Sequence, residues 1–188
     1  MRAFPNMTVV QPADAVSAKV LAHAAVDFTG PCMCVCTATR CRRVRPRDLP
    51  VRLGQGQHRG GLRHGYDHDR LRHSAEEGSG RRRHPEGAGH HVRVLDMATI
   101  KPLDNEAVLK AAAETGAIMT IEDHTIFGGL GSAVSEVVVQ NRPVPMEIVG
   151  IQDKFGESGD PELLYRDHGM DVDSIVAKAK ALVERKKS

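Results

Sequence analysis

The chain has 188 residues, 40% of them hydrophobic, and a formal net charge of +2, which suits one ordinary domain, or a domain plus part of another. No apolar run approaches the roughly 20 residues of a membrane-spanning helix. Residues 1–10 also lack the apolar region of a signal peptide, so we expect a cytoplasmic protein that does not enter a membrane. Aromatic residues make up only 3% and Trp is absent, so Val, Ile, Leu, Ala and Met must build the core.

The N-terminal flank predicts one strand and one helix. Met7–Val10 is a short apolar run, and a Pro-containing turn separates it from a helical pattern. Asp14 precedes this pattern, where its carboxylate can cap the helix or oppose its dipole. The side chains expected on the buried face of the helix are Val16, Val20, Leu21 and Ala24.

Residues 32–86 interrupt this regular pattern. Arginines crowd residues 40–83, seven of the ten histidines lie between His58 and His91, and the segment holds every cysteine: Cys32, Cys34, Cys36 and Cys41. Neither a strand period nor a helix period is sustained here. Such a stretch cannot bury enough apolar surface to offset its ordering entropy, so we expect it to be irregular or poorly packed.

The composition of this segment suggests two kinds of site, and neither is well supported. The spacing C-x-C-x-C lacks the longer loops of zinc sites and no second cysteine pair follows, so we expect no metal. The arginines could attract phosphate groups electrostatically. Because no aromatic residues are interleaved with them, we expect no specific nucleic-acid recognition.

The C-terminal flank predicts alternating strands and helices. The expected strands are "VRVLDM" (92–97), "AIMTIED" (117–123) and "PMEIVGI" (145–151), and "TIKPLD" (99–104) is expected to be a turn. The expected helices are "NEAVLKAAAETG" with cap Asp104 and end Gly116, "SAVSEVVVQ" with Ala133, Val134, Val137 and Val138 inward, "DPELLYRDHG", and the last helix with cap Asp171. This alternation predicts an α/β fold with a mostly parallel sheet covered by helices.

Three features of this flank are candidates for function. The loop "GGLG" lies between a strand and a helix, so the backbone amides of Gly129, Leu130, Gly131 and Ser132 could bind an anion, or could simply allow close packing. Glu122 and His124 end a strand at the carboxyl edge of the sheet, where acid–base residues often lie. Lys101 could contact an anion or be an exposed turn residue.

Both flanks resemble the transketolase family. "RAFPNMTVVQPADAV" resembles the end of its pyrimidine-binding domain, and "VRVLDMATIKPLDNEAVLKAAAETGAIMTIEDHTIFGGLGSAVSEVV" with "KFGESGDPELLYRDHGMDVDSIVAKAKAL" resembles its C-terminal domain. The resemblance implies three segments: 1–31 as the tail of the pyrimidine-binding domain, 32–86 as an anomalous insert, and 87–188 as the C-terminal domain.

Between the flanks, the strand and "GKA" segment of the family are not visible. Other reading frames of the same codons permit them: from the third base of the Cys32 codon, "YVRLYRYPV" is allowed, and from the second base of the Leu53 codon, "LGKANTVV" is allowed. Further along that frame, "TDMTMIASGI" is also allowed. We therefore interpret residues 32–86 as out-of-frame translation, in which the cysteines are accidental.

The resemblance implies a C-terminal section or subunit of a transferase that moves two-carbon ketol units between sugar phosphates, as in the pentose phosphate pathway. Thiamine diphosphate and Mg²⁺ would be bound by an N-terminal subunit or domain outside this chain, within a homo- or hetero-oligomer. The chain alone is expected to be inactive and marginally stable, because a missing central strand leaves exposed sheet edges.

Two alternatives remain open. One is a non-catalytic docking or dimerisation module of a thiamine enzyme, similar to 1-deoxyxylulose-phosphate synthases or to 2-oxoacid dehydrogenase β subunits. The other is a basic nucleic-acid-binding protein that uses residues 40–83.

Overall fold

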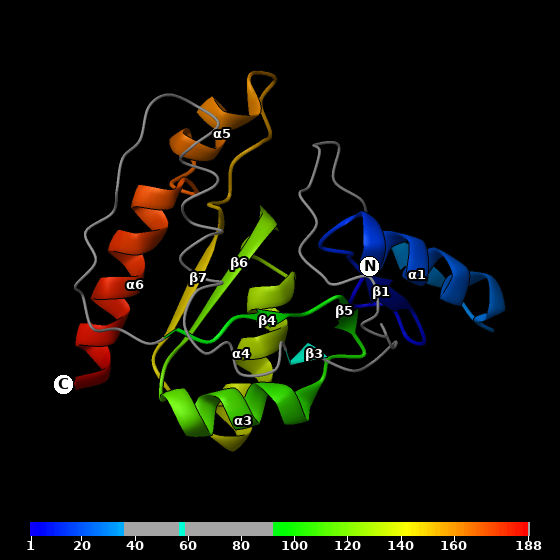
Figure 1. Cartoon of the computed structure of the whole chain (residues 1–188), viewed down its shortest axis with the longest axis horizontal. Coiled ribbons are helices and arrows are strands. Elements are labelled where there is room, and N and C mark those ends of the chain that lie inside the picture. Colours follow the sequence, from blue (N-terminus) through cyan, green and yellow to red (C-terminus); the bar gives the residue numbers. More distant parts are fainter. Residues whose placement is uncertain (36–56, 59–91, 188) are drawn as a thin grey trace.

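The computed structural model describes residues 1–35, 57–58 and 92–187 (Figure 1). Most of the Arg- and His-rich segment, with Cys36 and Cys41, lies outside the described residues, so its predicted irregularity and frame shift remain predictions. The described elements are β1 (Thr8–Val10), α1 (Ala15–Asp27), β2 (Cys32–Cys34), β3 (Gln57–His58), β4 (Leu95–Asp96), β5 (Thr99–Lys101), α3 (Asn105–Thr115), β6 (Ile118–Thr125), α4 (Leu130–Asn141), β7 (Met146–Ile151), α5 (Pro161–Asp167) and α6 (Val172–Lys187).

The strand β1 joins the two ends of the chain in one small sheet. It pairs in parallel with β2 on one side and antiparallel with β5 on the other. All three residues of β1 are buried, and Val10 packs with Leu21 of α1 and Ala98 in a compact apolar cluster. The N-terminal flank and the start of the C-terminal flank therefore share a sheet and a core.

Two boundaries predicted from the sequence were wrong in this sheet. Thr99–Lys101 was expected to be a turn and forms β5, because its β-branched residues pair with the backbone of β1 and the Gln11 amide donates to the Ala98 carbonyl at 2.8 Å. The irregular segment was expected to begin at Cys32, but Cys32–Cys34 forms β2. Strand pairing uses backbone groups, so it tolerates these side chains at the edge of the sheet.

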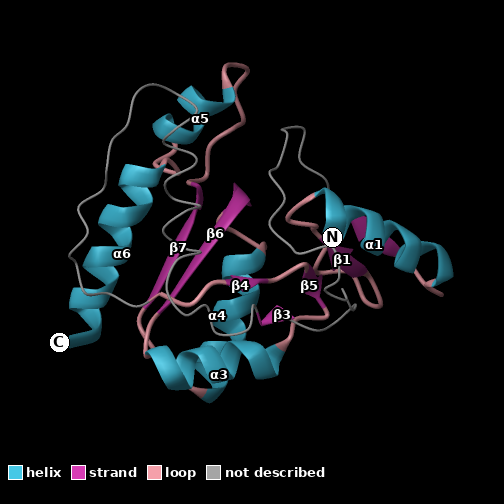
Figure 2. Ribbon diagram, in the orientation of Figure 1, coloured by secondary structure: helices cyan, strands magenta, loops and turns pink. Residues whose placement is uncertain are grey.

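The strands β6 and β7 form a parallel pair that lies between helices. Figure 2 shows α4 beside this pair and α6 along β7 on the other side. The main core gathers where α3 and α4 meet the strands: Val108, Val134 and Val138 are each buried. The predicted α/β fold of parallel strands covered by helices is confirmed for the part of the chain that the structure describes.

The helix caps follow the sequence closely. The Asp14 side chain accepts the Ser17 amide at the start of α1, and the Asp104 side chain accepts the Ala107 amide at the start of α3. The helix α3 ends at Gly116, whose φ of 68° requires the left-handed region that glycine adopts easily. Asp171 accepts bonds from the Ser174 amide and hydroxyl at the start of α6, so these predicted caps are confirmed.

The strand β6 extends beyond its predicted end. The sequence predicted a strand to Asp123 and a loop from His124, but β6 continues through Thr125, which pairs with Ile151 of β7 after a shift in register. The strand predicted at 92–97 is much shorter than expected, since only Leu95–Asp96 pairs, with β3.

Candidate functional site

The carboxyl end of β6 carries a buried carboxylate. Glu122 is only 6% exposed, and its two oxygens accept different backbone amides: Leu130 N–H at 2.7 Å and Gly131 N–H at 2.8 Å. These amides belong to the first turn of α4, where no intrahelical acceptor exists for them and the helix dipole favours negative charge. Glu122 is therefore an internal cap that ties the end of β6 to the start of α4.

Two of the four amides predicted to bind an anion, those of Leu130 and Gly131, donate to Glu122. Ser132 is also engaged, because its hydroxyl accepts the Gly128 amide at 2.9 Å and lies 3.2 Å from the Ile126 carbonyl, to which it donates. An external anion at Gly129–Ser132 would have to displace the Glu122 carboxylate. Anion binding at this loop therefore stays a prediction.

Lys101 anchors the N-terminal residues of the chain. Its ammonium donates to the backbone carbonyls of Arg2 at 2.9 Å and Phe4 at 2.6 Å. The two acceptors are neutral backbone groups, so this arrangement fastens residues 1–5 beside β5. A role for Lys101 toward an anion stays a prediction.

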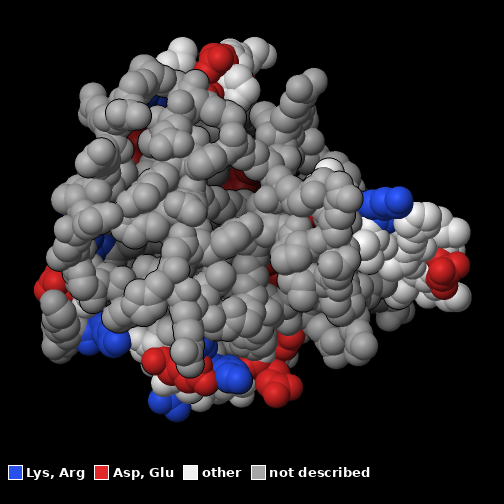
Figure 3. Space-filling view, in the orientation of Figure 1, with Lys and Arg blue, Asp and Glu red and all other residues white. Residues whose placement is uncertain are grey.

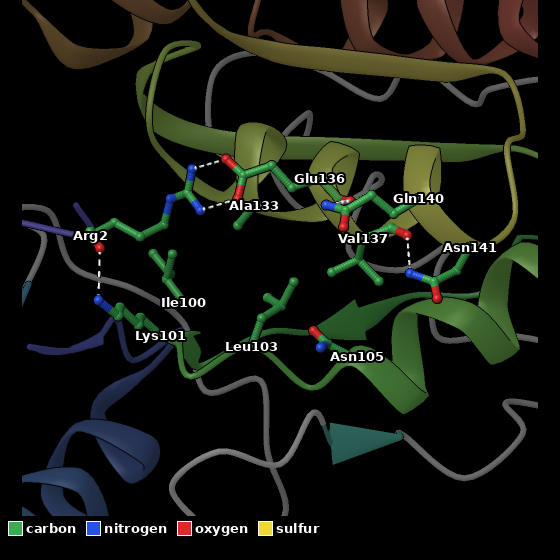
Figure 4. A pocket seen from close by; sticks show the side chains of 10 residues that line it. All are labelled: Arg2, Ile100, Lys101, Leu103, Asn105, Ala133, Glu136, Val137, Gln140 and Asn141. Carbon is green, nitrogen blue, oxygen red and sulfur yellow. Dashed lines mark hydrogen bonds and ion pairs between the residues drawn. The ribbon is translucent and has the colours of Figure 1, made fainter. Parts of the chain in front are cut away.

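Arg2 connects these N-terminal residues to α4 (Figure 4). Its guanidinium donates twice to the Glu136 carboxylate, at 2.8 and 2.5 Å, and Nε donates to the Gly128 carbonyl at 3.2 Å. The hydrogen bonds with Glu136, and the negative charges of Glu136 and Glu122, raise the pKa of Arg2 above its ordinary value. The same hydrogen bonds lower the pKa of Glu136.

Sequence reasoning missed both residues of this pair. They lie 134 positions apart, and neither belongs to a motif that marks an ion pair. Only the docking of the N-terminal segment against α4 brings them together.

A groove of about 440 Å³ lies between β5, the start of α3 and α4. Figure 4 shows charged groups at one end and amide side chains at the other. Its lining residues are Arg2, Ile100, Lys101, Leu103, Asn105, Ala133, Glu136, Val137, Gln140 and Asn141. The charged groups here are paired with one another or with the backbone, so the groove presents mainly amide groups and aliphatic side chains.

The other weak catalytic candidate, His124, is exposed. Its Nδ1 lies 2.7 Å from the Thr125 carbonyl, so Nδ1 carries the proton in this arrangement. No hydrogen bond links His124 to Glu122 within the described residues. The neighbouring Asp123 accepts from the Tyr165 hydroxyl of α5 at 3.1 Å. A direct catalytic role for Glu122 or His124 stays a prediction.

Within residues 1–35, 57–58 and 92–187, no group of three or more His, Cys, Asp or Glu side chains could hold a metal ion. Of the four cysteines, Cys32 and Cys34 are described, and neither forms a disulfide with another described residue. In this part of the chain no helix combines the length and apolar character that crossing a bilayer requires.

Comparison with known proteins identifies the kind of chain that carries these features. Residues 84–175 match the family model described as transketolase, C-terminal domain. The subunit SqwH of the 6-deoxy-6-sulfo-D-fructose transketolase of Clostridium sp. (strain MSTE9) is 34% identical over 195 residues, with 99% of this chain and 58% of that protein covered. An apulose-4-phosphate transketolase subunit of Phocaeicola vulgatus (strain ATCC 8482) is 34% identical over 192 residues, with 98% of this chain and 59% of that protein covered.

A solved structure titled "Split gene transketolase, inactive beta4 tetramer" has the same fold. It superposes with a TM-score of 0.81 at 31% sequence identity and covers 99% of this chain and 61% of that one. The chain thus spans about three fifths of the length of the relatives it matches.

The fold is that of an α/β chain similar to a split-gene transketolase. Residues 84–175 match the C-terminal domain of transketolases, and nearly the whole chain is similar to transketolase subunits.

Proposed function

We propose that the chain is a C-terminal section or subunit of a transketolase-like enzyme that transfers two-carbon ketol units between sugar phosphates. The observation that carries this proposal is the agreement of the fold with a split-gene transketolase over 99% of the chain. Two relatives that match almost the whole chain are also named as transketolase subunits. We further propose a cytoplasmic role in sugar-phosphate metabolism of the pentose phosphate type.

The described residues do not fit a thiamine diphosphate site. The amide pair at the start of α4 already holds the Glu122 carboxylate, and no group of acidic, His or Cys side chains in the described residues could hold Mg²⁺. We therefore propose that an N-terminal partner binds the cofactor. When bound, thiamine diphosphate would supply the carbanion that carries the two-carbon unit.

In this proposal the contribution of the chain itself is structural support for the partner. Residues 1–31 would form the tail of the pyrimidine-binding domain and residues 87–188 the C-terminal domain. The pairing of β1 with β5 and the Arg2–Glu136 contact support a fixed arrangement of the two. The carboxyl edge of β6 and β7 leads into two loops that expose Phe127 and Phe155 to solvent, which favours contact with a partner.

The experiment mixes this chain with the thiamine-binding N-terminal subunit of a two-subunit transketolase and measures ketol transfer from a ketose phosphate. We expect neither component to be active alone. Transfer catalysed by this chain without a partner would contradict its proposed role as a subunit. Transfer by the mixture would support the proposal.

The exposed Phe127 and Phe155 also suit the second candidate, a non-catalytic docking module of a thiamine enzyme. Such a module would bind the partner, as measured by sedimentation, without changing its turnover. A change in turnover on binding therefore separates the two candidates.

A nucleic-acid-binding role would depend on residues 40–83, of which the structure describes only residues 57–58. Figure 3 shows blue and red side chains interspersed along the rim where α3 lies. Binding of DNA or RNA that falls steeply with salt and depends on the arginines of residues 40–83 would instead favour it.

A further inference from the structure

Glu122 is a buried titratable residue, and the proposed function assigns no role to it. Both of its carboxylate oxygens face the first turn of α4, and each accepts one backbone amide at ordinary charge-assisted hydrogen-bond distances. Two amides converging on one carboxylate at a helix N-terminus is the arrangement by which proteins hold free anions. In this chain the anion is the Glu122 carboxylate, which is part of the polypeptide itself.

The Glu122 carboxylate lies close to two glycines of the loop, at positions where a larger residue would contact it. A Cβ added to Gly129 would lie 1.9 Å from Glu122 Oε2. A Cβ on Gly131 would lie 3.1 Å from Glu122 Oε1 and 2.4 Å from the Ile148 side chain. Glycine at position 129 is therefore explained by the approach of the carboxylate.

Two further groups lie near this carboxylate. The Thr120 hydroxyl is buried, has no hydrogen-bond partner within the described residues, and lies 2.9 Å from where a Cβ of Gly131 would be. The Arg2 guanidinium donates to the Gly128 carbonyl, and the negative charge of Glu122 contributes to raising the pKa of Arg2. An unpartnered hydroxyl and a nearby positive charge add to the two amides in an arrangement suited to a carboxylate.

We propose that the N-terminus of α4 is a carboxylate-binding site whose resident ligand is the side chain of Glu122. Glu122 acts as a positioning residue: it fixes the turn from Ile126 to Gly129 at the carboxyl edge of the sheet. A small free carboxylate would bind there once the Glu122 side chain is removed. With Glu122 present, the site excludes external phosphate.

Chemical rescue tests this directly on the full chain. Glu122→Ala removes two carbons and two oxygens, which are the heavy atoms of acetate. We expect the change to lower the melting temperature by about 5 to 10 °C. Sodium acetate at about 0.5 M should restore a substantial part of that loss, while sodium chloride at matched ionic strength should not, because only acetate binds the folded state. Phosphate at about 1 mM, where its general stabilising effect as a salt is negligible, should not raise the melting temperature of the unaltered chain.

A double-mutant cycle measures whether the effect of Gly129→Ala on the melting temperature depends on the Glu122 side chain. A merely structural role of Glu122 would not change that effect. Gly129→Ala should lower the melting temperature strongly in the unaltered chain and much less in the Glu122→Ala background, since its Cβ clashes with the carboxylate. Gly128→Ala is the matched control. Its φ of 76° makes alanine strained in either background, and a Cβ there would meet no atom within 4 Å, so its effect should be additive.

Each result of these experiments either supports the proposal or overturns it. Rescue by acetate together with non-additivity at Gly129 supports the proposal; if Glu122→Ala is unfolded in chloride, recovery of its circular dichroism in acetate counts equally. Acetate that does no better than chloride, or equal costs of Gly129→Ala in both backgrounds, overturns it. Phosphate at about 1 mM, too dilute to act as a generally stabilising salt, that raised the melting temperature of the unaltered chain would show displacement of Glu122 and also overturn it.

Discussion

Arg2 and Glu136 form a two-pronged ion pair in which Nη1 and Nη2 each donate to a different carboxylate oxygen, at 2.8 and 2.5 Å. The pair ties the N-terminal segment to the middle of α4, beside the groove shown in Figure 4. Its position makes it a test of how the two flanks of the chain are held together.

Glu136→Gln should destabilise the chain in a pH-dependent way. The hydrogen bond with Arg2 lowers the pKa of Glu136 below its ordinary value of 4.5, so the pair stabilises the fold fully above that value and the contribution is lost as the pH falls through the lowered pKa. The Glu136 side chain is 57% exposed, and solvent screening keeps the contribution below about 1 kcal/mol. Urea unfolding at about pH 7 and about pH 3 measures the difference, which should shrink at the lower pH.

Glu157→Gln is the control for this measurement. Glu157 lies in an exposed loop and has no ion-pair partner among the described residues, so the same change should have little effect at either pH. An equal loss of stability at both pH values in Glu136→Gln would mean that the ion pair is not its cause.

Asp14→Ala should cost about 1 to 2 kcal/mol of unfolding free energy. The buried Asp14 and Ser17 cap each other at the start of α1: the Ser17 amide donates to Asp14 Oδ1 at 2.8 Å, and the Asp14 amide donates to Ser17 Oγ at 3.0 Å. Chemical denaturation followed by circular dichroism measures the loss. Thr29→Ala, at an exposed position just beyond the helix, should change the midpoint little; a similar loss in both variants would count against the cap.

Val134→Ala and Val139→Ala make the same chemical change on one helix with opposite expectations. Val134 is 3% exposed and packs in the main core, while Val139 is 67% exposed. Removing two buried methyl groups should cost about 1.5 to 3 kcal/mol at Val134. The change at Val139 should fall within about 0.5 kcal/mol of zero. Thermal unfolding of both variants is the measurement, and equal effects would show that α4 does not bury the face described.

Sequencing the coding DNA tests the interpretation of residues 32–86 as out-of-frame translation. We expect inserted or deleted bases near the codons for Cys32, Arg43 and Glu86, and a corrected frame that encodes the family's missing strand. A relative whose protein carries the same Cys-, Arg- and His-rich residues in this segment would contradict the interpretation.

Local features were predicted well from the sequence. The caps Asp14, Asp104 and Asp171 and the helix end at Gly116 depend on side chains and backbone a few residues apart, so a short pattern is enough to identify them. The inward-facing Val134 and Val138 were likewise predicted by helical spacing alone.

Long-range pairing was not predicted. The strand β5 exists because the backbone of β1, some 90 residues earlier, offers it hydrogen-bond partners, and nothing in Thr99–Lys101 itself indicates this partner. The GGLG loop was recognised as a possible anion site, but its occupant, Glu122, could be identified only in three dimensions. A motif predicts which groups are available, and the fold decides what they bind.

The sequence by itself determined the alternation of strands and helices, where most helices begin and end, and the resemblance of both flanks to one family. The tertiary structure alone decided that Arg2 meets Glu136 and that Glu122 occupies the first turn of α4. The physical reason is that caps and periodicity are short-range effects of neighbouring residues. Ion pairs and carboxylate–amide contacts between distant segments depend on how the chain folds back on itself.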